Sequence, residues 1–248
     1  MTTTRIVEVR AGVLKKNDEL ARALRRRFEE AGVFVVNFVS SPGTGKTAFL
    51  ERTLSTLVAS GTRAAALVGD LETDNDAQRL ARSGAPARQI NTHGRCHLEA
   101  EMIGAFLDEW DLNELEYLFI ENVGNLVCPA SYDLGEALRV ALLSVTEGED
   151  KPLKYPTMFN SADVAVITKI DLAEACEFDR AAAYAAIESV RPGMAILEVS
   201  AKRGAGMDNW LVLLRERRES WQREVAGAAR YRALRPDGSR VASPDSPD

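Results

Sequence analysis

The feature that most constrains the fold is an alternation of short apolar runs with longer helical stretches, which begins at Val33. The runs VFVVNFV, RAAALVG, YLFIEN, VAVIT and MAILEVS have the character of strands, and stretches such as KTAFLERTLSTLVAS separate them. Strands that alternate with helices of this length are typical of a parallel sheet buried on both faces. We therefore predict an α/β fold in which helices cover both faces of a mostly parallel central sheet.

The two ends of the chain differ from this alternating region. The stretch NDELARALRRRFEEA, residues 17–31, has the pattern of an amphipathic helix, with Asn17 as its expected N-cap and Gly32 just past its end. We expect residues 1–32 to form an N-terminal segment whose helix packs on a central domain of residues 33–222. The remainder, residues 223–248, becomes rich in Pro, Ser and Asp, so we expect a partly disordered extension that frays beyond about residue 235.

Composition and charge exclude several classes of protein. Of 248 residues, 46% are hydrophobic and 27% charged, which is ordinary for a globular chain, and the net charge of −6 argues against nucleic acid as a partner. The charged start MTTTRIVEVR is unlike a signal peptide, and no run approaches the roughly 18 apolar residues of a membrane span, so we expect a cytoplasmic protein. Three separated cysteines predict metal binding or burial rather than disulfides.

A strand, a tight turn and a helix follow one another in FVVNFVSSPGTGKTAFLERTL. The turn SSPGTGKT fits the phosphate-binding pattern G-x-x-x-x-G-K-S/T, except that Ser40 takes the first position. Small residues let backbone amides face a phosphate, Lys46 reaches the terminal phosphates, and the Thr47 hydroxyl can bind Mg²⁺. The alternative is an ordinary glycine-rich turn. The expected nucleotide-binding residues here are Pro42, Gly43, Thr44, Gly45, Lys46, Thr47 and Ala48.

Two later motifs favour guanine as the base. TKID follows an apolar run where P-loop GTPases carry N-K-x-D, with Thr168 in place of the usual Asn. Asp171 can accept hydrogen bonds from the guanine N1 and N2 groups, and Lys169 can pack along the base. Downstream, the tripeptide Ser200-Ala201-Lys202 resembles the loop that caps guanine in the same enzymes. The alternative for TKID is an exposed turn at a strand end.

Carboxylates after two expected strands predict the magnesium site and the hydrolytic groups. Glu121 and Gly124 stand where GTPases commonly have D-x-x-G, so Glu121 should face Mg²⁺ and Gly124 the γ-phosphate. In ALVGDLETDNDAQR, Asp70 is the carboxylate expected to reach Mg²⁺, and Asp74 or Asp76 should orient the attacking water. The expected catalytic groups are therefore Lys46, Asp70, Asp74 and Asp76. No arginine finger can be assigned, which predicts slow intrinsic hydrolysis.

The stretch NTHGRCHLEA holds both histidines of the chain. Cys96 and His97, joined by Cys128 in IENVGNLVCPA, make a nitrogen-and-sulfur set suited to Zn²⁺ or Ni²⁺. Three ligands leave the site incomplete, which suits a metal that is held and then passed on. A second subunit could complete it, and nucleotide could gate it. His93 and Glu101 are weaker candidates, and the alternative is that these residues are simply buried.

The motifs together are similar to one family. SSPGTGKT, GDLETDNDAQR, INTHGRCHLEA, LFIENVGNLVCPASYDLGE, EGEDKPLKYPTMFNSAD, TKIDL and VSAKRGAGMDNW resemble HypB, the hydrogenase nickel-incorporation GTPases of the SIMIBI class, over roughly residues 10–220. The resemblance implies a GTPase that loads nickel into the large subunit of [NiFe] hydrogenase, receives nickel from a partner chaperone and dimerises with GTP. Cys96, His97 and Cys128 match the family's metal positions, which places the metal site in a GTPase domain of residues 33–222.

The chain departs from the family pattern in several places. Some members carry an N-terminal C-x-x-C-G-C site or a His-rich stretch, but residues 1–32 have neither Cys nor His, so we expect no high-affinity nickel site or nickel storage there. HGRCH and EAE replace the common GKGCH and DAH. Three alternatives stay open: a GTPase for another metalloenzyme such as urease, although the Cys-Pro-His motif of UreG is absent, a P-loop kinase, and a metal-binding module whose nucleotide is only structural.

Overall fold

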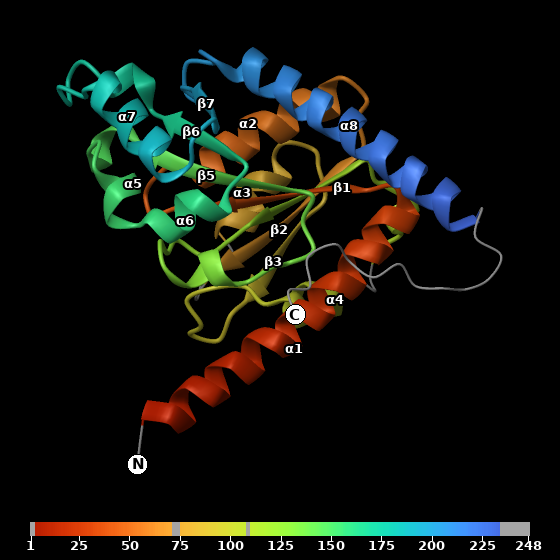
Figure 1. Ribbon diagram of the computed structural model, residues 1–248. Coiled ribbons are helices and arrows are strands. Elements are labelled where there is room, and N and C mark those ends of the chain that lie inside the picture. The colour runs from red at the N-terminus through yellow and green to blue at the C-terminus, as the bar shows by residue number, and fades with distance from the viewer. Residues whose placement is uncertain (1–2, 71–74, 108–109, 234–248) are drawn as a thin grey trace.

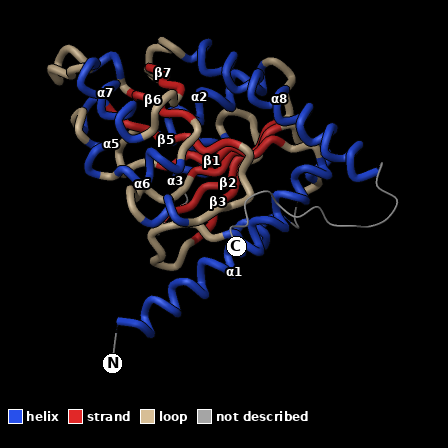
Figure 2. The backbone as a smooth tube through the Cα atoms, in the orientation of Figure 1, coloured by secondary structure: helices blue, strands red, loops and turns tan. Residues whose placement is uncertain are grey.

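The computed structural model describes residues 3–70, 75–107 and 110–233, and over these the chain builds one seven-stranded sheet (Figures 1 and 2). Every strand pairing is parallel, in the order β3-β2-β4-β1-β5-β6-β7. The strands are β1 Phe34–Val39, β2 Ala64–Asp70, β3 Ala87–Asn91, β4 Tyr117–Glu121, β5 Leu138–Ser144, β6 Val164–Thr168 and β7 Ala195–Glu198. The predicted α/β fold with a parallel central sheet is confirmed.

Helices cover both faces of this sheet (Figure 1). The α-helices are α1 Thr3–Ala31, α2 Lys46–Ala59, α3 Asn75–Ala81, α4 Ala100–Leu107, α5 Lys151–Lys154, α6 Pro156–Ser161, α7 Arg180–Val190 and α8 Met207–Ala233. Short 3₁₀ turns are η1 Leu112–Glu114, η2 Cys128–Ser131, η3 Val145–Glu147 and η4 Ile170–Leu172. None of the helices in the described part of the chain combines the length and the apolar character that crossing a bilayer requires.

Side-chain alternation along the strands divides the core into layers. On one side of β1, Phe34, Val36 and Phe38 pack with α2, α3 and α8. On the other side, Val35 packs with α1 and α4, and Val39 packs with α6 and α7. The first layer is centred on the fully buried Trp210 of α8, whose indole Nε1 donates a 3.0 Å hydrogen bond to Thr53 Oγ1. This packing fixes α2, and with it the loop that precedes it, against the sheet.

Helix α1 is longer than the sequence predicted, and α8 extends into residues expected to follow the central domain. Helix α1 begins at Thr3 rather than at Asn17, so it includes the residues before Asn17. Asn17 therefore lies inside the helix and does not cap it. At the other end, α8 runs to Ala233, so residues 223–233 continue a helix across the expected boundary at 222. The expected frayed tail concerns residues 234–248, which lie outside the described residues.

Candidate nucleotide and metal sites

The turn predicted to bind phosphate lies between β1 and α2, at the carboxyl edge of the sheet. Gly43 and Gly45 have φ of 75° and 100°, a left-handed conformation that glycine adopts without strain. Lys46 Nζ donates to Ser40 Oγ over 2.9 Å, so the serine that departs from the motif holds the motif's lysine. Burial lowers the pKa of Lys46, although the nearby Glu121 carboxylate opposes that effect. The loop therefore presents a lysine whose charge is poorly solvated.

Glu121, the carboxylate predicted to face Mg²⁺, ends β4 directly beside this loop. Its Oε1 accepts a 2.7 Å hydrogen bond from Thr47 Oγ1, and its side chain is buried, with the residue only 4% exposed. Burial raises the pKa of Glu121 to about 7, against the opposing effects of Lys46 and Thr47. Glu121 Oε2 is buried without a hydrogen-bond partner in the described structure. A carboxylate oxygen left unpaired beside a threonine hydroxyl fits a hard cation such as Mg²⁺.

The sequence also predicted roles at this edge for Gly124, Asp70, Asp74 and Asp76. Gly124 lies so close to the loop that a Cβ there would come within 2.8 Å of Pro42 Cα, which explains why glycine is needed. Asp76 lies in the first turn of α3 and its charge acts on the pKa values of both Lys46 and Glu121. Asp70 is the last residue of β2, but its side chain and the whole of Asp74 lie outside the described residues.

The TKID and SAK motifs meet beside the phosphate loop at a cavity of about 570 Å³. Asp171 Oδ1 accepts a 2.6 Å hydrogen bond from Ser200 Oγ, and this bond is the main cause that lowers the pKa of Asp171. Thr168 Oγ1 donates to the Thr44 carbonyl over 2.6 Å, so the threonine that replaces asparagine still ties this strand to the loop. Lys169 Nζ donates to Gly43 O. Of the predicted residues, those that line the cavity are Gly45, Ala48, Thr168, Lys169, Asp171, Ala201 and Lys202.

Several residues of this region were not predicted. Arg52 and Ser55 line the cavity from α2, and they lie on the helix face of Ala48, four and seven residues after it. Arg79 lines it from α3. Glu147, within the EGEDKPLKYP motif, accepts a 2.6 Å hydrogen bond from Thr44 Oγ1. The helical spacing from Ala48 was a signal that could have identified the two α2 residues. Local spacing could not identify Glu147, because its contact with Thr44 joins positions 103 residues apart.

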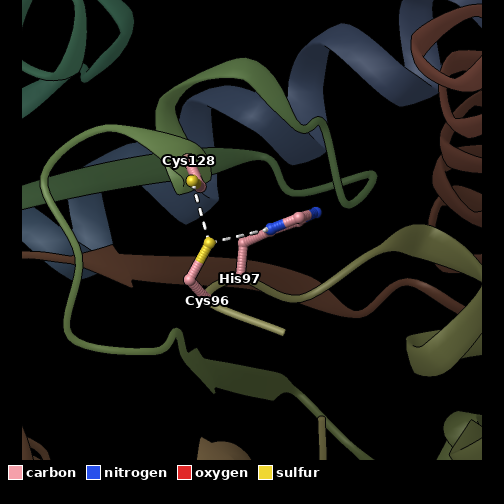
Figure 3. Close-up of side chains that lie close together, drawn as sticks. All are labelled: Cys96, His97 and Cys128. Carbon is pink, nitrogen blue, oxygen red and sulfur yellow. Dashed lines mark hydrogen bonds between the residues drawn. The ribbon is translucent and has the colours of Figure 1, made fainter. Parts of the chain in front are cut away.

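The three predicted metal ligands converge (Figure 3). Cys96 and His97 lie between β3 and α4, and Cys128 begins η2 after β4. The two Sγ atoms are 2.9 Å apart, Cys96 Sγ lies 3.7 Å from His97 Nδ1, and all three ligand atoms fall within 4.8 Å of one another. His93 and Glu101 are not part of this group; Glu101 pairs instead with Lys16 across 3.2 Å.

Two neighbouring side chains lie against the His97 ring. Its Nε2 lies 3.2 Å from Glu99 Oε1, and its ring lies 3.9 Å, centre to centre, from that of Tyr132. Burial lowers the pKa of His97, which favours the neutral ring that metal binding needs. A carboxylate at one ring nitrogen leaves the other, Nδ1, facing the sulfurs. Sequence reasoning missed Glu99, although its position two residues after His97 was a signal.

The fold and the phosphate loop define a P-loop nucleotide-binding protein, and a Cys/His cluster lies at the same edge of its sheet. The family model for the CobW/HypB/UreG nucleotide-binding domain matches residues 11–198. The chain is 47% identical to the hydrogenase maturation factor HypB of Azotobacter vinelandii over 235 residues, which is 94% of this chain and 77% of that protein. It therefore belongs to the HypB group of the CobW/HypB/UreG family, as the resemblance predicted.

Solved structures agree with this assignment. The crystal structure of HypB from Helicobacter pylori in complex with nickel has a TM-score of 0.78 at 42% identity, covering 84% of this chain and 97% of that one. HypB from Archaeoglobus fulgidus has a TM-score of 0.76 at 38% identity, covering 82% and 98%. A LAO/AO transport system kinase, with a TM-score of 0.55 at 17% identity over 90% and 78% of the two chains, shares the fold alone.

Proposed function

We propose that this protein is a GTP-hydrolysing metallochaperone that delivers nickel during the maturation of [NiFe] hydrogenase. The observation that carries the proposal is the convergence of two thiols and an imidazole within 4.8 Å, next to a nucleotide edge. The name of the A. vinelandii relative and the nickel in the H. pylori structure support the same function. Nickel is cargo in this scheme, bound and then released.

The chemistry of Cys96, His97 and Cys128 suits that role. Two thiolates and a neutral imidazole form a set that binds Ni²⁺ or Zn²⁺ through sulfur and nitrogen. Both cysteines are partly exposed, so an ion can reach them from solvent. Three protein ligands leave a coordination position for a ligand from a donor or an acceptor. Such a site exchanges its metal more readily than a closed four-ligand site.

The nucleotide of the proposal is GTP with Mg²⁺. Lys46 would bind the terminal phosphates, Thr47, Asp70 and Glu121 would hold Mg²⁺, and Asp74 or Asp76 would orient the attacking water. Mg²⁺ neutralises charge that develops on the phosphates. The remaining residues of the proposed nucleotide site are Pro42, Gly43, Thr44, Gly45, Ala48 and Gly124 at the phosphates and Thr168, Lys169, Asp171, Ser200, Ala201 and Lys202 at the guanine.

GTP-dependent dimerisation completes the proposal, because a second subunit can add ligands to a three-ligand site. The nucleotide and metal sites are connected through β4. Asn122 follows the proposed Mg²⁺ ligand Glu121, and its Oδ1 accepts a 3.1 Å hydrogen bond from Leu98 N, one residue after His97. A nickel-delivery chaperone and the hydrogenase large subunit are the proposed partners.

The name of one relative supports a second candidate for the enzyme that receives the nickel. The H. pylori protein, 42% identical over 87% of this chain and 90% of its own length, is named a hydrogenase/urease maturation factor. The same metal site can serve urease, because client choice depends on surface contacts and not on the metal ligands.

The proposal is tested by Ni²⁺ binding with GDP and with a non-hydrolysable GTP analogue, while molecular mass reports dimerisation. Cys96→Ala and Cys128→Ala should each abolish tight binding, and GTP hydrolysis should require Mg²⁺. Cys176→Ala is the matched control, since Cys176 is exposed and outside the described cluster. Ni²⁺ affinity that neither substitution lowers, or that no nucleotide changes, would contradict the proposal.

A further inference from the structure

Asn17 is a buried polar residue in the middle of α1, with 5% of its surface exposed. Both ends of its amide are hydrogen-bonded to backbone groups of other segments. Nδ2 donates to the carbonyl of Asp133 over 2.8 Å, and Oδ1 accepts from the amide of Ala100 over 2.9 Å. Asparagine is unfavourable inside a helix, and here it satisfies the first amide of α4, a group that the helix itself cannot pair.

The two segments that Asn17 joins are those that carry the metal ligands. We define the Cys96 arm as residues 92–100 and the Cys128 arm as residues 125–135. Ala100 lies three residues after His97, and Asp133 lies five residues after Cys128. The arms leave different strands, β3 and β4, which β2 separates in the sheet. A single side-chain amide therefore joins the two halves of one site from α1. The halves also meet directly, where Leu98 N donates to Asn122 Oδ1 and where the His97 ring lies against Tyr132.

Other contacts hold the Cys128 arm on α1. Arg25 Nη2 donates to both carboxylate oxygens of Asp133, over 2.7 and 3.0 Å. Gly135 has a φ of +81° and lies so close to α1 that a Cβ would come within 2.9 Å of Ala21 O and 3.0 Å of Arg25 N. Glycine is the residue that tolerates both constraints. Helix α1 thus provides a rigid surface on which the Cys128 arm is fixed.

We propose that Asn17 is a positioning residue of the metal site. It fixes the two arms at the separation that brings the Sγ atoms of Cys96 and Cys128 within reach of one ion. The inference deepens the proposed function and rests on it for the identity of the cargo. Helix α1 contributes no ligand to the described cluster, yet its docking through Asn17 determines the affinity of the cluster for metal. Residues that orient metal ligands typically change affinity about 10- to 100-fold when they are replaced.

The test compares two substitutions with different consequences. Asn17→Ala removes both bonds, whereas Asn17→Asp keeps the acceptor for Ala100 N but sets a carboxylate against the Asp133 carbonyl. Both should weaken Ni²⁺ binding at least about 10-fold. In metal-free protein, both should also slow disulfide formation between Cys96 and Cys128 on treatment with the thiol oxidant diamide, because that rate reports how often the two thiols meet.

The matched control is Thr53→Val, which removes the buried hydrogen bond from Trp210 on the opposite face of the sheet. It should lower the melting temperature but leave Ni²⁺ affinity and the diamide rate unchanged. Wild-type values of both for Asn17→Ala and Asn17→Asp, measured where the variants are folded, would overturn the inference. If the wild type bound no Ni²⁺, the proposed function would fail, while the diamide rate would still decide the role of Asn17.

Discussion

Replacing Glu121 by glutamine should flatten the pH dependence of folding stability. Burial raises the pKa of this carboxyl from 4.5 to about 7 in the folded protein. Because the folded-state pKa lies above the unfolded one, the contribution of the group to stability is complete below pH 4.5 and is lost as the pH rises through about 7. Glutamine is neutral at every pH, so the variant lacks this loss.

The size of the effect follows from the difference in pKa between the folded and the unfolded protein. A tenfold change in a proton-binding constant corresponds to about 1.4 kcal/mol. Ionisation of Glu121 should therefore lower the free energy of unfolding by about 3 kcal/mol at pH 8 and by about 1 kcal/mol at pH 5.5. Between pH 5.5 and pH 8, the free energy of unfolding of the wild type should therefore fall by about 2 kcal/mol more than that of the variant. Thr47 can donate to the glutamine carbonyl as it does to Glu121, so the comparison isolates the charge.

The assay is urea unfolding of the protein in EDTA without nucleotide, followed by circular dichroism at pH 5.5 and pH 8. Glu114→Gln, at an exposed carboxylate on η1, is the control and should parallel the wild type. Parallel pH profiles for the wild type and Glu121→Gln would refute the reasoning, since they would mean that the buried carboxyl ionises as readily in the folded as in the unfolded chain.

Three other predictions concern separate parts of the molecule. Glu99→Gln should weaken Ni²⁺ binding about 10- to 100-fold, because a carboxylate no longer orients His97, and competition with a chromophoric chelator measures this. Unchanged affinity would remove Glu99 from the site. Asp171→Asn should favour xanthosine over guanosine nucleotides, since the amide donates where the carboxylate accepted; a retained guanosine preference in competition binding would contradict the assignment. Trp210→Ala should lower the free energy of unfolding by about 3–5 kcal/mol, because it leaves a cavity at a fully buried position and removes the hydrogen bond to Thr53 Oγ1. Urea unfolding at one pH tests this.

The sequence by itself determined the features that depend on neighbours along the chain. The strand–turn–helix around Lys46 could be predicted because the turn needs glycine at positions of positive φ and the apolar run before it fits a buried strand. The choice of Cys96, His97 and Cys128 followed from their chemistry and clustering. The parallel sheet followed from the alternation of strands and helices, although the sequence did not single out β3 and β5.

Only the tertiary structure decided which distant residues meet. Asn17 has the sequence character of a helix cap, and it does cap a helix, but that helix begins 83 residues later at Ala100. Glu147 reaches Thr44, and Thr168 reaches the phosphate loop, across 103 and 124 residues. Local propensity carries no information about such contacts, since they arise when the sheet brings the ends of its strands to one edge. The same closure gives Glu121 its raised pKa, because burial is a property of the assembled fold.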